Sequence, residues 1–292
     1  MRILITNDDG VHSQGLKAIR DVLIPIAESV VTIAPESDCS GLAQACTFSR
    51  PVSVTRLGEG EHAVFSCDGT PTDCVRVGLL GGLAAGPDIV VCGINHGANL
   101  ADDVAYSGTI GAGREAAILG TSALCLSQQT PTGSFAVNYR EDLSQRGLSY
   151  DFGLAADYGS DLARAMCQAP ADEPVVLNVN FPTAASSPNG VLTRVGRRAY
   201  PRSHSPAWPD GLVTQFFYLF GEPDEEIPEE GEAWGTDISA LKAGLISVMV
   251  VPVSWRPGHL TEAERAFLGA LSSALRTPNS FDLASQAPSA AP

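Results

Sequence analysis

The chain has 292 residues, of which 44% are hydrophobic and 17% charged, so it can bury the core of one large α/β domain or two smaller ones. Its formal net charge is −15, and the absence of clustered Lys and Arg argues against stable binding to a nucleic-acid polymer. With no apolar run of about 18 residues and no leader-like start, the sequence predicts neither a membrane span nor a secretory signal.

The N-terminal segments predict a βαβ unit. Residues 2–6 and 30–34 are short apolar runs typical of buried strands, and the apolar residues between Leu16 and Ile26 recur at helical spacing. A strand, a helix and a strand in this order favour a right-handed crossover between parallel strands. A polar loop at 39–50 and two further strands at 51–56 and 62–67 are predicted next.

A helix is predicted to begin after Thr70. Thr70 can cap it, Pro71 suits its first position, and Asp73 can complete a capping box. Beyond this helix, which should end near Leu80, the pattern predicts strands at 89–92, 123–127 and 175–180, helices at 107–119 and 152–167, and loops at 93–106 and 128–150.

The character of the sequence changes near residue 186. Residues 191–195 and 212–220 predict the longer, less buried strands of an antiparallel arm. A helix at 237–243, a strand at 245–253, a last helix at 261–275 and an Ala-, Ser- and Pro-rich tail at 277–292 follow. We therefore predict one domain over residues 1–276, with its core at 1–185 and 237–276 and its arm at 186–236.

The seven cysteines form no Cys-x-x-Cys pair, and most of them lie in apolar surroundings. Buried thiols of this kind are typical of a reducing compartment. We therefore expect a cytoplasmic protein.

The acidic turn Asn7-Asp8-Asp9-Gly10 follows the first predicted strand and precedes a helix. Ligands of open α/β sheets bind beyond the carboxyl ends of the strands. Two adjacent carboxylates repel each other unless a cation lies near them, and hard cations such as Mg²⁺ or Mn²⁺ prefer oxygen ligands. The alternative is a plain surface turn, because Asp-Gly also favours hairpins.

Three later loops add polar groups after predicted strands. Ser40, beside Gly41, could ligate a metal or donate to a phosphate. Asn95 offers a neutral amide oxygen, and residues 107–109 open a small-residue helix whose N-terminus favours an anion. Each is, taken singly, also an ordinary loop, turn or cap. At one edge of a sheet they would together suit a metal and a phosphate.

Other catalytic patterns are missing from the sequence. It contains no G-x-S-x-G elbow, no H-E-x-x-H zinc motif and no Walker A loop. The five histidines are scattered, and only His12 and His96 lie near the proposed site. Either could be a proton donor or a solvated loop residue.

In combination these segments resemble one family, the SurE survival-protein nucleotidases. The chain is similar to the family's opening at 3–10, to its G-T-P-x-D-C-V segment at 69–75, to G-I-N-x-G-x-N at 93–99 and to D-V-x-Y-S-G-T at 103–109. The chain departs from the family pattern at three positions. The family usually has Gly in place of Ala101, Ala in place of Gly113 and Gly in place of Ala116.

The resemblance implies an α/β fold with a Rossmann-like, mostly parallel sheet flanked by helices and a protruding C-terminal β-hairpin arm. It implies hydrolysis of nucleoside 5′- or 3′-monophosphates, and sometimes of short polyphosphate, by homodimers or homotetramers that exchange this arm. One divalent metal per subunit, Mg²⁺ or Mn²⁺, would be held by Asp8, Asp9, Ser40 and Asn95. We predict catalytic roles for Asp8, Asp9 and Asn95, and contacts with substrate or phosphate from Asn7, Ser40, Gly41, Asn99, Ser107, Gly108 and Thr109.

Two alternatives stay open. An aspartyl-phosphate phosphatase would use an Asp after the first strand as nucleophile, although its usual D-x-D spacing is replaced here by adjacent acids. A receiver-like signalling module also has an acidic pair after its first strand, but it needs a phosphoacceptor Asp after a middle strand. Residues 89–92 are followed by Gly-Ile-Asn instead.

Overall fold

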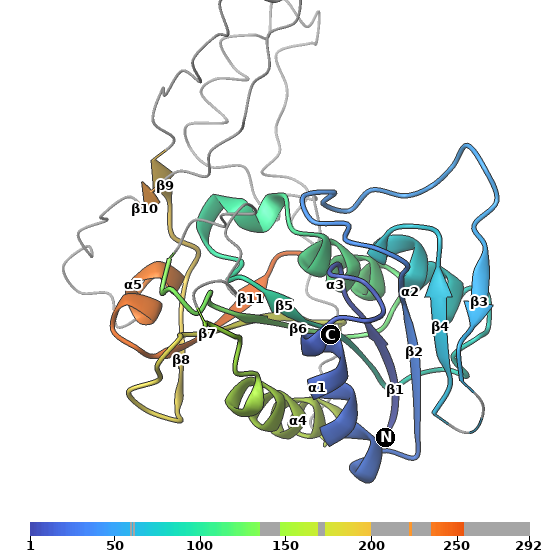
Figure 1. The fold of residues 1–292 in the computed structure, drawn as a ribbon, viewed down its shortest axis with the longest axis horizontal. Helices are drawn as coiled ribbons and strands as arrows, with labels where there is room; N and C mark the ends of the chain where they lie inside the picture. Colours follow the sequence, from blue (N-terminus) through green and yellow to red (C-terminus); the bar gives the residue numbers. More distant parts are fainter. Residues whose placement is uncertain are drawn as a thin grey trace, which may run out of the picture. The chain divides into compact units, whose positions relative to one another are not determined.

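A nine-stranded, mostly parallel sheet lies at the centre of the chain, with helices on both faces (Figure 1). The computed structural model describes residues 1–58, 60, 62–134, 147–168, 173–199, 222–223 and 235–253. The predicted strand at 212–220, the helix at 261–275 and the tail at 277–292 lie outside these residues. The predicted α/β class with a mostly parallel sheet is confirmed.

The sheet has the strand order β3-β4-β2-β1-β5-β6-β7-β11-β8. Its strands are β1 (Arg2–Thr6), β2 (Ser29–Pro35), β3 (Val54–Arg56), β4 (Val64–Cys67), β5 (Ile89–His96), β6 (Ala123–Gln128), β7 (Val176–Phe181), β8 (Gly190–Leu192) and β11 (Ile246–Val251). A separate antiparallel pair joins β9 (Arg198–Ala199) to β10 (Glu222–Pro223).

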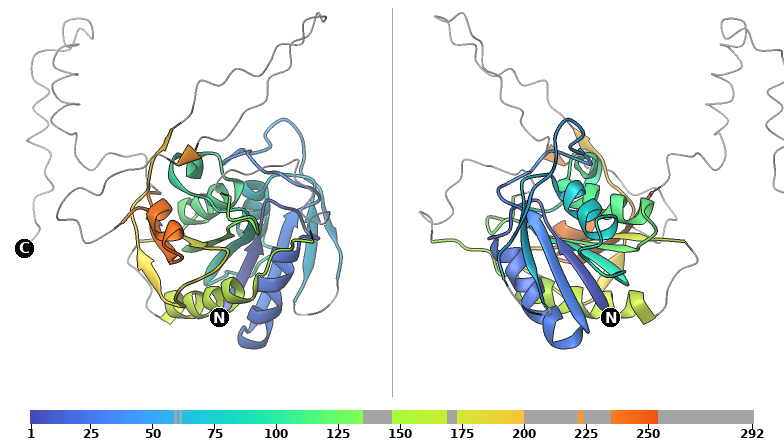
Figure 2. Two further views of the ribbon diagram at one scale, coloured as in Figure 1. Left: turned by 60° about the vertical axis from the view of Figure 1, so that its left-hand side comes forward. Right: turned by 90° about the vertical axis from the view of Figure 1, so that its right-hand side faces the viewer.

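The helices form a layer on each face of the sheet (Figure 2). They are α1 (Gln14–Leu23), which continues into η1 (Ile24–Ile26), α2 (Pro71–Leu79), η2 (Ala101–Ala105), α3 (Gly108–Ile118), α4 (Gly153–Gln168) and α5 (Asp237–Lys242). Helices α1 and α4 cover one face, and α2 and α3 cover the other. No helix in the described ranges is long and apolar enough to cross a membrane.

The centre of strand β1, Ile3-Leu4-Ile5, shows why a buried parallel strand carries consecutive apolar residues. Ile3 and Ile5 pack into the core on the α1 and α4 side, whereas Leu4 packs into the core on the α2 and α3 side. Alternate side chains of a strand point to opposite faces, so the middle of a strand that is covered on both faces is apolar at consecutive positions.

The chain order places a switch point at the carboxyl end of β1. Strand β1 pairs in parallel with β2 on one side and with β5 on the other. The chain passes from β1 through α1 to β2, and it returns to the other side of β1 only through α2 and β5. Ligand sites of open parallel sheets lie at such a point.

The predicted start of α2 is confirmed. The Thr70 side chain accepts the N–H of Asp73, the Asp73 carboxylate accepts the N–H of Thr70, and Pro71 occupies the first turn. This reciprocal pair satisfies two N–H groups that the start of a helix leaves open.

Two predicted boundaries are wrong. Strand β5 continues to His96, and its pairing with β6 shifts between Cys92 and Asn95, which marks a β-bulge within the segment predicted as loop. Residues 191–195 do not form an arm strand, because Gly190–Leu192 pairs in parallel with β11 at the sheet edge. An edge strand of three residues has too few side chains to show which partner it joins.

Helix α1 packs closely against the bulge of β5. A Cβ atom at Gly15 would lie 1.9 Å from the carbonyl oxygen of Ile94, whereas a Cβ at Gly58 would meet nothing within 4 Å. Only a glycine therefore allows α1 to approach β5 this closely.

We predict that Gly15→Ala lowers the free energy of unfolding by about 3 kcal/mol, because the methyl group and the Ile94 carbonyl cannot share the same space. Denaturant unfolding would measure the change. The matched variant Gly58→Ala should stay within about 0.5 kcal/mol of the wild type. If Gly15→Ala and Gly58→Ala unfolded at the same denaturant concentration, the close packing of α1 against β5 would be contradicted.

Candidate active site

The acidic turn is held in one conformation by Asn7. Its Nδ2 donates to the carbonyl oxygen of Gly10 at 2.9 Å and to Ser13 Oγ at 2.7 Å. Gly10 has a φ of +98°, a value that favours glycine, and Ser13 caps helix α1. The turn therefore connects a strand to a helix, and the hairpin alternative does not apply.

Asp8 extends from this turn to the start of α3. Thr109 Oγ1 donates to Asp8 Oδ1 at 2.5 Å, and the Thr109 N–H donates to Oδ2 at 3.1 Å. A Cβ at Gly108 would lie 3.0 Å from Asp8 Oδ2, so glycine leaves room for the carboxylate. Because Asp8 is only 2% exposed, both of its oxygens are held inside the protein.

Asp9 extends instead to the end of β5. The backbone N–H of His96 donates to Asp9 Oδ2 at 3.2 Å, and His96 Nδ1 lies 3.0 Å from Oδ1. The imidazole meets Tyr150 and Phe152 edge-on, with ring centroids 4.8 Å and 5.0 Å away. Each carboxylate of the pair is thus held by the backbone and the side chain of a single residue.

The segment after β5 is anchored by buried amides. The Asn99 N–H donates to Asn180 Oδ1 at 2.8 Å, and Asn99 Nδ2 donates to Ser127 Oγ at 2.9 Å. Asn95 Nδ2 donates to the carbonyl oxygen of Gly97 at 2.8 Å. Within the described part of the chain Asn95 Oδ1 accepts no hydrogen bond, so this oxygen could ligate a cation.

The loop that carries Ser40 is fastened to the acidic turn. The Cys39 N–H donates to the carbonyl oxygen of Asp8 at 2.7 Å. Ser40 Oγ donates to Asp38 Oδ1 at 2.5 Å, so the hydroxyl is engaged within its own loop. The structure therefore brings Ser40 beside the turn through its neighbour Cys39.

Two acids hold the far end of this loop. Asp73 accepts the Thr47 N–H at 3.0 Å and Thr47 Oγ1 at 2.6 Å; burial raises its pKa, but these hydrogen bonds hold the pKa of Asp73 below its usual value. Glu115 accepts Gln44 Nε2 at 2.9 Å and pairs with Arg76 at 2.6 Å. The loop is therefore tied to both α2 and α3.

The start of α3 keeps donors available for an anion. Ser107 Oγ accepts the Ile110 N–H at 3.2 Å, so its own hydrogen can still be donated. Among the described residues, neither the Ser107 hydroxyl nor the Gly108 N–H donates a hydrogen bond. The helix dipole adds a partial positive charge at this end.

Among the residues that the structure describes, the carboxylate pair has no strongly basic partner. No Lys or Arg in the described ranges forms an ion pair with Asp8 or Asp9. Burial, and then the charge of Asp9, raise the pKa of Asp8 to about 6. A bound cation would offset both effects.

The oxygen donors fit a hard cation. The part of the chain that the structure describes has no group of three or more His, Cys, Asp or Glu side chains that could hold a metal. The candidate donors are therefore two carboxylates with the neutral oxygens of Asn95 and Ser40. This set suits Mg²⁺ or Mn²⁺ better than zinc, which takes His and Cys ligands.

Three residues predicted to contact phosphate use their side-chain donors inside the protein. Asn7 Nδ2 closes the acidic turn, Asn99 Nδ2 donates to Ser127, and the Thr109 hydroxyl donates to Asp8. In this structure they position other groups. Gly41 is exposed with a φ of +78°, and its phosphate contact stays a prediction.

Tyr150 and Phe152 contact His96, and Glu115 holds the loop that carries Ser40, although no sequence motif indicated these three residues. The aromatic pair falls at the boundary between a predicted loop and a predicted helix, where periodicity carries no information about contacts. For Glu115 the sequence gives a weak indication, because it is the only acidic residue in the small-residue helix α3.

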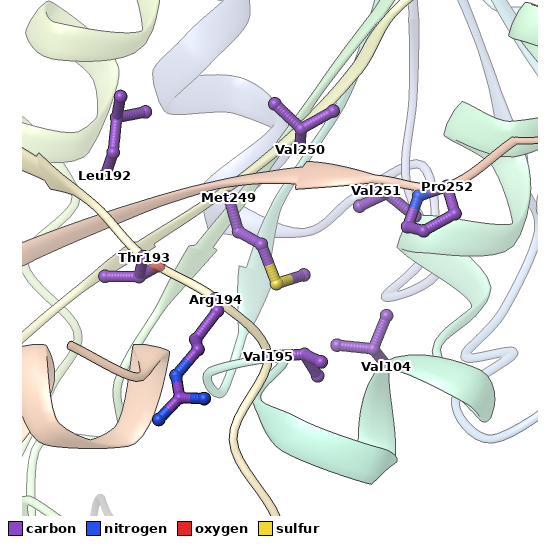
Figure 3. A pocket seen from close by; sticks show the side chains of 9 residues that line it. All are labelled: Val104, Leu192, Thr193, Arg194, Val195, Met249, Val250, Val251 and Pro252. Atoms are coloured by element: carbon purple, nitrogen blue, oxygen red, sulfur yellow. The ribbon is translucent and has the colours of Figure 1, made fainter. Parts of the chain in front are cut away.

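An apolar pocket of about 580 Å³ lies between η2 and strands β8 and β11 (Figure 3). Met249, Val195 and Val104 point toward one another across it. The lining consists of Val104, Leu192, Thr193, Arg194, Val195, Met249, Val250, Val251 and Pro252, none of which carries a carboxylate. Among the described residues, the lining therefore offers no carboxylate to a hard cation and includes no residue of the acidic turn.

The acidic turn, Asn95 and the open start of α3 converge beyond the carboxyl ends of parallel strands. They define an α/β protein with a polar ligand site at the switch point of its sheet. The family described as "Survival protein SurE" matches residues 3–202, and the chain belongs to this family.

Several curated relatives, each named 5′-nucleotidase SurE, are similar over most of their length. The protein of Syntrophotalea carbinolica is 38% identical over 85% of this chain and 90% of its own. That of Mesorhizobium japonicum is 37% identical over 85% and 92%, and that of Bradyrhizobium diazoefficiens is 35% identical over 94% and 100%.

A solved structure agrees with the fold. The crystal structure of the SurE protein from Aquifex aeolicus matches with a TM-score of 0.70 at 28% identity, covering 91% of this chain and 99% of the other. The family predicted from the sequence motifs is thereby confirmed.

We predict that Asp8→Asn stabilises the metal-free protein at pH 8 by about 2 kcal/mol. Asn can keep both contacts with Thr109 without a buried charge, because its oxygen can accept the Thr109 N–H and its NH2 group can donate to the Thr109 hydroxyl oxygen. An unfolded Asp has a pKa of about 3.9, so a folded pKa of about 6 means that stability is lost as the pH rises from about 4 through 6.

Unfolding in EDTA from pH 4 to 8 would measure this difference. The wild type and the variant should converge at the acid end, where Asp8 is protonated in both states. If Asp8→Asn were less stable than the wild type at pH 8, the buried charge of Asp8 would not destabilise the metal-free protein, and the prediction would be wrong.

Proposed function

We propose that this chain is a metal-dependent phosphomonoesterase that hydrolyses nucleoside 5′- and 3′-monophosphates to nucleoside and phosphate, with short polyphosphate as a further substrate. The proposal rests mainly on the adjacent carboxylates of Asp8, which is buried, and Asp9, which is partly buried. This pair has no Lys or Arg partner in the described ranges and lies beside the open start of α3. The relatives named 5′-nucleotidase SurE support a nucleotide as the substrate.

One divalent cation per subunit, Mg²⁺ or Mn²⁺, would be held by Asp8, Asp9, Asn95 and Ser40. Asn95 would contribute its Oδ1 without adding charge, and Ser40 Oγ would turn away from Asp38 to contribute. When bound, such a cation polarises a phosphoryl oxygen and makes water a better nucleophile at neutral pH.

The substrate phosphate would lie against the start of α3. The Ser107 hydroxyl and the Gly108 N–H would donate to its non-bridging oxygens, and the helix dipole would favour its charge. Thr109 would act indirectly, since its donors hold Asp8 in place. Phosphoryl transfer of this kind depends mainly on positioning and on charge neutralisation.

We place the reaction in the cytoplasm, because all seven cysteines are free thiols. The net charge of −15 argues against nucleic-acid polymers as partners. We further propose a homodimer or homotetramer formed through the C-terminal arm, which light scattering of the purified chain would detect.

We predict that Asp9→Asn lowers the rate of phosphate release from AMP a hundredfold or more, because it removes one of two anionic ligands from the metal. The assay would compare Mg²⁺, Mn²⁺ and EDTA across a nucleotide panel. Asp21→Asn, an exposed acid of α1 that pairs with Lys17, should retain full activity. Full activity in EDTA, or in Asp9→Asn, would contradict the proposal.

The same purified protein can exclude the two alternatives. An aspartyl-phosphate phosphatase would leave a phosphoenzyme after rapid quenching, and a receiver-like module would be labelled by acetyl phosphate without turnover. The adjacent acids in place of D-x-D, and the Gly-Ile-Asn that follows residues 89–92, disfavour both alternatives.

A further inference from the structure

We propose that His96 is the positioning residue that sets Asp9 as a metal ligand, an inference that rests on the proposed metal-dependent function. His96 reaches both oxygens of this carboxylate, with its backbone N–H 3.2 Å from Oδ2 and its Nδ1 3.0 Å from Oδ1. A carboxylate held on both oxygens does not rotate freely, so its remaining lone pairs keep one direction.

The imidazole is itself held in place by two aromatic rings. Tyr150 and Phe152 stack on each other with centroids 5.3 Å apart, and both meet His96 edge-on at interplanar angles of 89° and 86°. Phe152 is only 6% exposed and belongs to the core on the α1 and α4 side. The position of Nδ1 is therefore determined by the core of the domain.

The bulge of β5 aims His96 at the acidic turn. After the register shift between Cys92 and Asn95, His96 pairs with Gln128, and the Gly97 N–H donates to the Gln128 carbonyl at 2.9 Å. A bulge re-aims the side chains that follow it. His96 thus presents its backbone and its side chain to the same carboxylate.

Asp8 is likewise contacted on both oxygens by one residue, since the N–H and the hydroxyl of Thr109 both donate hydrogen bonds to it. The two adjacent carboxylates are therefore held in different directions, Asp8 by the start of α3 and Asp9 by the end of β5. For Asp8 this contact is buried, whereas His96 remains 25% exposed and can be replaced with less effect on folding.

The proposed role needs only an N–H donor at the place of Nδ1, the atom that lies 3.0 Å from Asp9 Oδ1. An Asn at position 96 can present its Nδ2 there, because that atom is as far from the backbone as His Nδ1. A Gln places its nitrogen one atom further out, near the place of Nε2. The backbone N–H is the same in every variant, so a comparison of Asn with Gln isolates the side-chain contact.

The test measures Mn²⁺ binding to the full-length protein by titration calorimetry, with circular dichroism as the check of folding. We expect His96→Ala and His96→Gln to raise the Kd for Mn²⁺ about tenfold or more, the range typical for residues that orient metal ligands. His96→Asn should bind within about threefold of the wild type. Asp9→Asn should lose measurable binding.

The inference is overturned if His96→Gln and His96→Ala bind Mn²⁺ like the wild type while Asp9→Asn does not. It is also overturned if His96→Asn binds as weakly as His96→Gln. If the wild type binds no Mn²⁺, or if Asp9→Asn binds it normally, the metal site itself is wrong and the proposed function fails with it. Should His96→Ala not fold, the comparison of Asn with Gln decides.

Discussion

The hydrogen bonds between Asp8 and Thr109 are the interaction on which the site depends. They join the end of β1 to the start of α3 across 101 residues of sequence. Because Asp8 is buried, its carboxylate would be left without partners if α3 began elsewhere. At this junction Gly108 leaves room for the Asp8 carboxylate, and the Cys39 N–H donates to the Asp8 carbonyl oxygen.

Asp9 is the second carboxylate of the site, and it extends to the end of β5, whereas Asp8 extends to the start of α3. His96 holds it from the end of β5, so two acids that are neighbours in sequence are fixed by two different elements. The fixed pair still carries two negative charges in a partly buried place, which raises the pKa of Asp8. Two neighbouring negative charges of this kind lower the stability of the fold, and the divalent cation that we propose would offset their repulsion.

Much of the fold could be predicted from local pattern. The apolar run of β1, the periodicity of α1 and the capping box at Thr70 depend on neighbours within a few residues, so the sequence shows them directly. Strand β8 and the extension of β5 through a bulge were mispredicted, because their pairing partners lie far away in sequence. The acidic turn was recognisable since its chemistry is local, and its position after β1 placed it at the sheet edge.

The sequence by itself determined the class of fold, the family, and the position of the acidic turn, of Asn95 and of residues 107–109 after parallel strands. Only the tertiary structure decided what each residue does there. Thr109 and Asn99 donate to protein atoms, and His96 belongs to the site through Asp9. The physical reason is that a hydrogen bond needs a partner at about 3 Å in the right direction. Between distant segments, that partner is set by packing of the whole core and not by local sequence.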